Sequence, residues 1–212
     1  DVSTYYAQGN ELSASVEDAN GNKYTETKNE YDGYYLTANG DKYTFAKQEK
    51  LCSDRASAFV PLRYTANMQY EGQASGITTS EAWNEYYLDG YHGELKSYKF
   101  SDKGRLGENG SGSFDYQTAI QYASNDAKHI FGLPVDVTVT SGGKTYHHVS
   151  AKYDMNYADH LTQIRQQLGG GEAVSDYVYD AYGNITKTTL PANGKGQRMW
   201  YSYRYEPVMN MY

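Results

Sequence analysis

The stretch that decides the fold runs from Ser175 to Glu206 and reads SDYVYDAYGNITKTTLPANGKGQRMWYSYRYE. Tyrosines recur in it at every second position, in one run with Tyr177 and Tyr179 and in another with Tyr201, Tyr203 and Tyr205. Because successive side chains of a strand point to opposite faces, a period of two predicts β-strands. Gly183-Asn184 and Asn193-Gly194 stand between the runs and suit tight turns. The stretch therefore predicts an antiparallel meander of hairpins.

The same period and the same turn signals continue along the chain. Val135, Val137 and Val139 alternate with polar residues, and Asn or Asp beside Gly recurs at short intervals. Two stretches are less regular. Residues 114–128 fit either a short helix or a strand followed by a loop. Residues 158–168 have helix-like spacing, but the repeat described next assigns them to a strand.

A Tyr-Asp pair recurs in register near the end of the chain. Tyr153-Asp154, Tyr179-Asp180 and Tyr205-Glu206 are separated by 26 residues and then by 26 again. With a two-residue insertion in the first copy, Leu161-Thr162 aligns with Ile185-Thr186. A period in this range is typical of arrays, in which each hairpin cannot bury its own face and must stack on its neighbours.

The residues of this motif have expected physical roles. Asp180, at the start of the turn, can accept hydrogen bonds from backbone N–H groups. Gly183, which precedes Asn184, is expected at positive φ. The tyrosines that end successive units, such as Tyr179 and Tyr205, are expected to stack across the sheet. We therefore assign the motif a structural role.

Fainter copies of the unit lie upstream. Residues 16–27 contain an Asp-x-x-Gly-Asn turn followed by a Thr-rich strand, whereas residues 51–79 do not fit the repeat. We therefore divide the chain into residues 1–128, a degenerate hairpin region interrupted near 51–79, and residues 129–212, which hold the clear repeats. The two parts are expected to form one continuous β array.

The segment YVYDAYGNITKTTLP, together with the downstream YSYRYE, resembles the YD repeat of the RHS (rearrangement hotspot) family. That family includes bacterial polymorphic toxins, the shell-forming subunits of insecticidal toxin complexes and the animal teneurins. The resemblance spans roughly residues 131–206. It implies an all-β fold in which antiparallel hairpins form an extended, curved or spiral sheet that closes as a shell.

The same resemblance implies a function and a location. The chain would be a non-catalytic wall section of a secreted or cell-surface bacterial protein, and the wall would enclose or present a toxin segment. Its expected partners are the rest of its own parent chain or that toxin segment. Exposed sheet edges would also favour self-association.

Composition narrows the function classes. The 212 residues are 39% hydrophobic, with 25 Tyr and 21 Gly, which is poor material for a compact aliphatic core but suits half-buried sheets. A formal net charge of −7 argues against nucleic acid or an anionic membrane as partner. No apolar stretch is long enough to insert into a bilayer. The chain begins at Asp1 without Met or a signal peptide, as expected of an excised piece or a mature chain.

Residues that could carry chemistry are few, and each has a simpler interpretation. His147 and His148 are adjacent on a predicted strand, so they point to opposite faces and cannot chelate one metal together. His160, with acidic neighbours, is expected to be a surface histidine. Asp89, His92 and Glu94 are close in sequence but lack a catalytic motif, and Cys52 is the single cysteine. We therefore expect no enzymatic activity, no cofactor and no metal site.

Two further segments invite alternatives. The start of a calcium loop is conceivable at Asp18, but a hairpin turn is favoured because no helices flank it. Trp83, Tyr86, Tyr87 and Tyr91 lie within nine residues of one another. Such aromatics can face a ligand, so a carbohydrate- or protein-binding β module of a bacterial adhesin is the alternative function.

Overall fold

The computed structural model describes residues 7–36, 42–44, 57–88, 93–104, 114–155 and 160–206. The predicted all-β fold is confirmed. The strand ladders recorded between described residues are antiparallel, and the helical content of this part of the chain is a single 3-10 turn at Asp126–Lys128.

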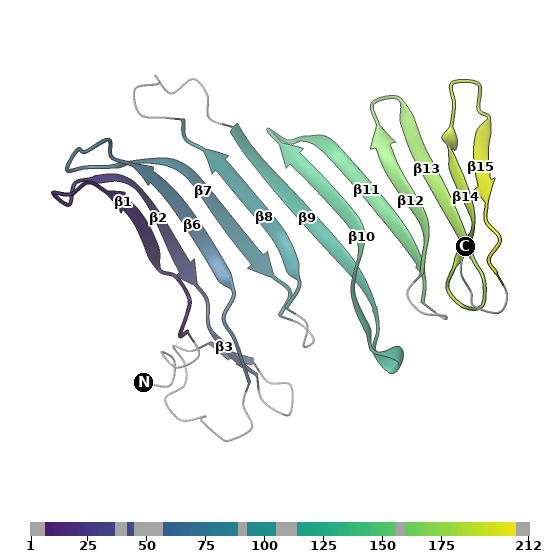
Figure 1. Cartoon of the computed structure of the whole chain (residues 1–212), viewed down its shortest axis with the longest axis horizontal. Helices are drawn as coiled ribbons and strands as arrows, with labels where there is room; N and C mark the ends of the chain where they lie inside the picture. Colours follow the sequence, from purple (N-terminus) through teal and green to yellow (C-terminus); the bar gives the residue numbers. More distant parts are fainter. Residues whose placement is uncertain are drawn as a thin grey trace. The chain divides into compact units, whose positions relative to one another are not determined.

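The chain divides into two compact units, Asp1–Thr118 and Ala119–Tyr212. In the first unit the main sheet has the order β1-β2-β6-β7-β8 (Figure 1). These strands are β1 (Ser13–Glu17), β2 (Lys23–Tyr31), β6 (Leu62–Gln69), β7 (Ile77–Tyr86) and β8 (Leu95–Asp102). The segment between β2 and β6 contributes a separate three-stranded sheet of order β4-β3-β5, from β3 (Tyr34–Leu36), β4 (Lys42–Thr44) and β5 (Ser57–Phe59). β2 therefore pairs with a strand that is distant in sequence.

In the second unit, each described strand pairs with the next one along the chain. The order is β10-β11-β12-β13-β14-β15 (Figure 1). The strands are β10 (Ile130–Ser141), β11 (Lys144–Asp154), β12 (His160–Leu168), β13 (Gly171–Tyr179), β14 (Ile185–Ala192) and β15 (Arg198–Ser202). This is the meander of hairpins that the repeat predicts.

The two irregular stretches resolve as strands. The helix-like spacing of residues 158–168 does not produce a helix, because His160–Leu168 forms β12 and pairs with strands on both sides. Residues 114–128 are β9 (Phe114–Asn125) followed by the 3-10 turn, and β9 contains the boundary between the units. Pairing with neighbouring strands overrides the local spacing.

The described parts of the sheets lack a conventional core. The buried hydrophobic side chains of the described residues are Tyr35, Ala66 and Tyr70, and no described side chain is below 2% exposure. Most strand residues are half-buried on either face. The strands are therefore held mainly by pairing with their neighbours.

Within the described ranges, no helix combines the length and the apolar content that a membrane span requires.

Candidate functional site

The turn after the second Tyr-Asp pair is closed by Asp180. Its Oδ1 atom accepts hydrogen bonds from the backbone N–H groups of Tyr182 and Asn184, both at 2.9 Å. The Asp180 N–H donates to the Asn184 carbonyl at 2.9 Å, and the Gly183 N–H donates to the Asp180 carbonyl at 3.2 Å. The positive φ predicted for Gly183 is present, at 88°. Nδ2 of Asn184 also donates to Oδ2 of Asp180 at 3.0 Å, and this bond, followed by those from the backbone N–H groups, lowers the pKa of the Asp180 carboxyl.

The same turn is built at two other places. Asp18 accepts from the N–H groups of Asn20 and Asn22, and Asn193 accepts from those of Lys195 and Gln197. The glycine at the fourth position has a φ of 82° in the first of these turns and 76° in the second. The segment weighed as a calcium loop is therefore the hairpin turn between β1 and β2, and its aspartate is occupied by its own turn.

The tyrosines of the motif occupy equivalent positions. The Tyr179 hydroxyl donates to the Leu161 carbonyl at 2.7 Å, and the Tyr205 hydroxyl donates to the Ile185 carbonyl, also at 2.7 Å. Leu161 and Ile185 are the residues that the sequence repeat aligns with each other. The Tyr153 hydroxyl makes the corresponding bond to a carbonyl 19 residues earlier in the chain, at 3.1 Å. We call these three bonds the tyrosine clamps; each ties a strand, or the residues that follow it, to the strand immediately before it in the chain.

A histidine packs against the tyrosine of the second clamp, Tyr179. The imidazole of His160 stacks on Tyr179, with ring centroids 4.4 Å apart and planes 16° apart. A Cβ atom added to Gly183 would lie 3.0 Å from Nε2 of His160, so this glycine is required by space as well as by φ. His160 pairs in register with Asp154, and both border a cavity of about 370 Å³. No group of three potential metal ligands occurs among the described residues.

The aromatic residues singled out as possible ligand contacts do not form one platform. Trp83 contacts the Tyr64 ring at 5.5 Å and lies 5.3 Å from Nζ of Lys99. Tyr86 lies three positions further along β7 and so points to the opposite face. There its hydroxyl donates to the Leu62 carbonyl at 3.1 Å. Trp83 and Tyr86 are therefore separated by the sheet.

Of the remaining candidate residues, the structure describes Tyr87 but not four others. Tyr87 follows β7, where its N–H donates to the carbonyl of Glu94 at 2.8 Å. Tyr91, Cys52, Asp89 and His92 lie outside the described residues.

The adjacent histidines follow the strand geometry that the sequence predicts. His148 bridges three strands, with Nε2 2.7 Å from Oδ2 of Asp136 and Nδ1 3.2 Å from Oε1 of Gln167. The hydrogen bond to Asp136 is the main reason that the pKa of His148 is raised. His147 pairs with Val139 and belongs to the other face.

Two features of the first unit were not anticipated from the sequence. One is a buried carboxylate, Glu26, which is 6% exposed and receives hydrogen bonds from Lys23 at 2.7 Å and from Tyr70 at 2.6 Å. These bonds lower its pKa to about 2. The other is a row of polar side chains that crosses four strands through Asn67. In the sequence, the alternating Thr25 and Thr27 of β2 indicate a polar face on that strand, but not its continuation onto other strands.

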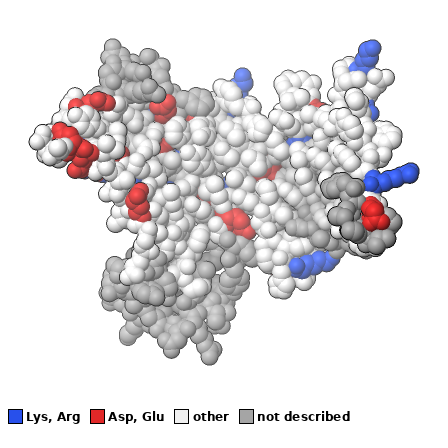
Figure 2. Space-filling view, viewed as in Figure 1, with Lys and Arg blue, Asp and Glu red and all other residues white. Residues whose placement is uncertain are grey.

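Several charged side chains of the described residues form pairs between neighbouring strands. Examples are Lys96 with Glu85 at 2.6 Å and Lys103 with Glu81 at 3.3 Å. On the face shown in Figure 2, the Lys and Arg side chains of the described residues stand apart from one another. Exposed pairs of this kind add little stability individually.

Comparison with known proteins finds similarity at the level of structure. The sequence matches no family model and no curated protein. Among solved structures, the chain is similar to a chain in the crystal structure of TcdB2-TccC3-Cdc42, with 10% sequence identity and a TM-score of 0.21. The match covers 92% of the present chain and 11% of that chain. At this TM-score the similarity supports no further conclusion.

We expect Gly183→Val to destabilise the chain by about 1–2 kcal/mol or more, because a β-branched residue is strained at positive φ and would press on His160. Chemical denaturation followed by circular dichroism measures the change. The matched control is Gly194→Val, since Gly194 has no atom within 4 Å of an added Cβ. Equal stability of the two variants would contradict the turn geometry.

We expect Tyr179→Phe to lower the free energy of unfolding by about 1 kcal/mol, because the Leu161 carbonyl loses its hydroxyl donor while the ring is kept. Tyr182→Phe is the control, as this side chain is 80% exposed. If both substitutions prove neutral in the same denaturation experiment, the clamp contributes no stability.

The raised pKa of His148 predicts a pH dependence. A folded-state pKa above the ordinary value of 6.5 means that this histidine contributes its full stability below 6.5 and loses it as pH rises through the folded-state pKa. The stability difference between the wild type and His148→Gln should therefore be larger at about pH 5.5 than at about pH 8.5. A difference that is constant or grows with pH would show that the histidine does not act through its charge.

Proposed function

We propose that this chain is a non-catalytic wall section of a bacterial YD-repeat protein of the RHS type, secreted or displayed at the cell surface. The observation that carries the proposal is the repetition of one turn and one clamp. The turn that Asp180 closes recurs at Asn193, and the clamp of Tyr179 recurs at Tyr205. Repeated local geometry without a core is what a wall built from stacked hairpins requires.

The surface properties support the same role. Side chains on the sheet faces are half-buried and largely polar or aromatic, so either face tolerates water. A wall around a large compartment needs such a face, because side chains cannot fill a wide interior. The wall would enclose or present a toxin segment, and its immediate partners would be other parts of its own parent chain.

Protease protection in the natural gene product that contains this chain tests the proposal. If the array is a wall, limited proteolysis should leave an enclosed segment from outside this chain uncut until denaturant opens the array. The same segment produced separately should be cut at once. Because any exposed sheet edge would favour self-association, light scattering should first confirm a single-chain mass at the concentration used.

Equal cleavage rates for every segment, inside and outside the native array, would contradict enclosure. If the segment stays uncut even after the array has been denatured, its protection comes from its own folded structure and not from enclosure.

A further inference from the structure

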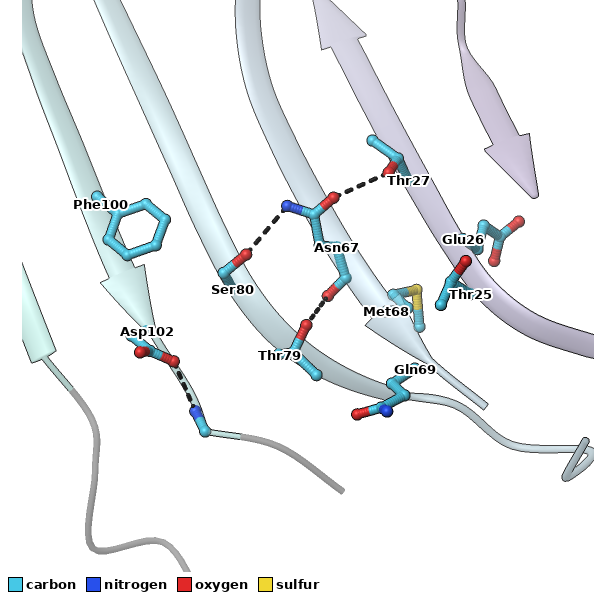
Figure 3. A pocket seen from close by; sticks show the side chains of 11 residues that line it. Thr25, Glu26, Thr27, Asn67, Met68, Gln69, Thr79, Ser80, Phe100 and Asp102 are labelled. Carbon is cyan, nitrogen blue, oxygen red and sulfur yellow. Dashed lines mark hydrogen bonds between the residues drawn. The ribbon is translucent and has the colours of Figure 1, made fainter. Parts of the chain in front are cut away.

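A groove of about 590 Å³ lies on the main sheet of the first unit, over β2, β6, β7 and β8 (Figure 3). Most of the side chains along it are short and polar. They include hydroxyls, amides and one carboxylate, from Thr25, Thr27, Asn67, Gln69, Thr79, Ser80 and Asp102. A groove of this kind favours a ligand that forms many hydrogen bonds over one that is mainly apolar.

Four of these residues form a straight line, which we call the polar row. In the strand register Thr27 pairs with Asn67, Asn67 with Ser80, and Ser80 with Asp102. Residues paired in this way point to the same face of a sheet. With strands about 4.8 Å apart, the row extends over about 14 Å. That interstrand spacing is close to the repeat of one pyranose ring along an extended glycan.

The polar row is oriented by its own hydrogen bonds. The Thr27 hydroxyl donates to Oδ1 of Asn67 at 2.8 Å, and Nδ2 of Asn67 donates to Oγ of Ser80 at 3.0 Å. Asn67 is thereby fixed in place by partners on both neighbouring strands. A preorganised row loses little conformational entropy when a ligand binds.

Unused hydrogen-bonding capacity remains along the row. Oδ1 of Asp102 accepts from the Gly104 N–H at 2.9 Å, while Oδ2 has no partner among the described residues. The Ser80 oxygen accepts from Asn67, which leaves its own O–H to donate. A donor next to an acceptor matches a sugar hydroxyl, which both donates and accepts.

Phe100 provides the apolar part of the groove. It lies two positions before Asp102 on β8, so the two share a face, and Figure 3 shows its ring beside the polar row. The ring stacks on Tyr116 with centroids 5.3 Å apart, and Tyr98 lies 5.9 Å from the same tyrosine. This support holds the ring in place, and its electron-rich face suits the C–H groups of a sugar ring.

The charges restrict the class of ligand. The described residues that line the groove include the carboxylate of Asp102 but no Lys or Arg. Glu26 also borders the groove, but its side chain points to the other face, where Lys23 and Tyr70 donate to it. An anionic ligand would therefore be repelled, and a wholly apolar one would leave the polar row without water or partners. We propose that this groove binds a neutral oligosaccharide, with its hydroxyls on the polar row and one ring against Phe100.

The first test is an NMR titration of the intact chain with defined probes. Cellohexaose, xylohexaose and maltohexaose represent neutral glycans, and hexagalacturonate is the anionic control. At least one neutral probe should shift the amide signals of Thr27, Asn67, Ser80 and Asp102 in a saturable way, while hexagalacturonate should not. Because it uses the wild type, this result does not depend on the folding of any variant.

Variants then locate the site. Asn67→Ala and Phe100→Ala should each weaken binding of the active probe about tenfold or more. The matched control is Lys99→Ala, since Lys99 is the neighbour of Phe100 on β8 and points to the opposite face. Its affinity should equal that of the wild type, and circular dichroism should show that all three variants are folded.

Three results would overturn the proposal. They are saturation by no neutral probe, shifts confined to signals outside the polar row, and binding that survives both Asn67→Ala and Phe100→Ala. Binding lost on Trp83→Ala but kept in those variants would place the ligand on the other face and would equally reject this groove. None of these results bears on protease protection by the wall, so the two proposals fail independently.

Discussion

Pairing between neighbouring strands is the interaction on which the rest of this structure depends. A globular domain gains most of its stability by burying apolar side chains between layers. Here the buried hydrophobic side chains of the described residues are Tyr35, Ala66 and Tyr70, so layer packing contributes little. Hydrogen bonds along the ladders, contacts between paired side chains and the tyrosine clamps must compensate. This constraint explains why turns and clamps are repeated so closely in the second unit.

The clamps solve a problem specific to thin sheets. A single hairpin in water is marginally stable, and an added neighbour stabilises it only if the register is fixed. The Tyr205 hydroxyl donates to the carbonyl of Ile185, and the Asn193 turn closes the other end of the same β14-β15 hairpin. In each hairpin of the repeat, the turn and the clamp thus fix the strand register locally. The same openness leaves both faces accessible, as the proposed wall and the proposed groove over Asn67 each require.

Much of this fold could be predicted from the sequence because the determining signals are local. The positive φ of Gly183 and the equivalence of Leu161 and Ile185 follow from residues within one repeat. Alternation alone also shows that residues three apart on a strand, such as Trp83 and Tyr86, point to opposite faces. Proximity in sequence therefore does not bring Trp83 and Tyr86 together on one face.

The features that could not be predicted depend on distant strands. The polar row joins Thr27 to Asn67, which is 40 residues away, because β2 skips the small sheet and pairs with β6. No local pattern specifies that choice of partner or its register. The stack of His160 on Tyr179, by contrast, joins the consecutive strands β12 and β13 of one hairpin. The candidate groove is therefore formed by pairing between strands far apart in sequence, whereas the array of hairpins follows from sequence signals within each repeat.

Thiol labelling on adjacent residues of one strand tests the central claim most directly. In a Cys52→Ser background, cysteine would replace Lys187 in one variant and Thr188 in another, since these neighbours on β14 point to opposite faces. If the sheet is a single layer, both thiols should react under native conditions at rates comparable to those in denaturant. Strong native protection of one thiol, with the other freely reactive, would show that a second layer covers that face and would contradict the account.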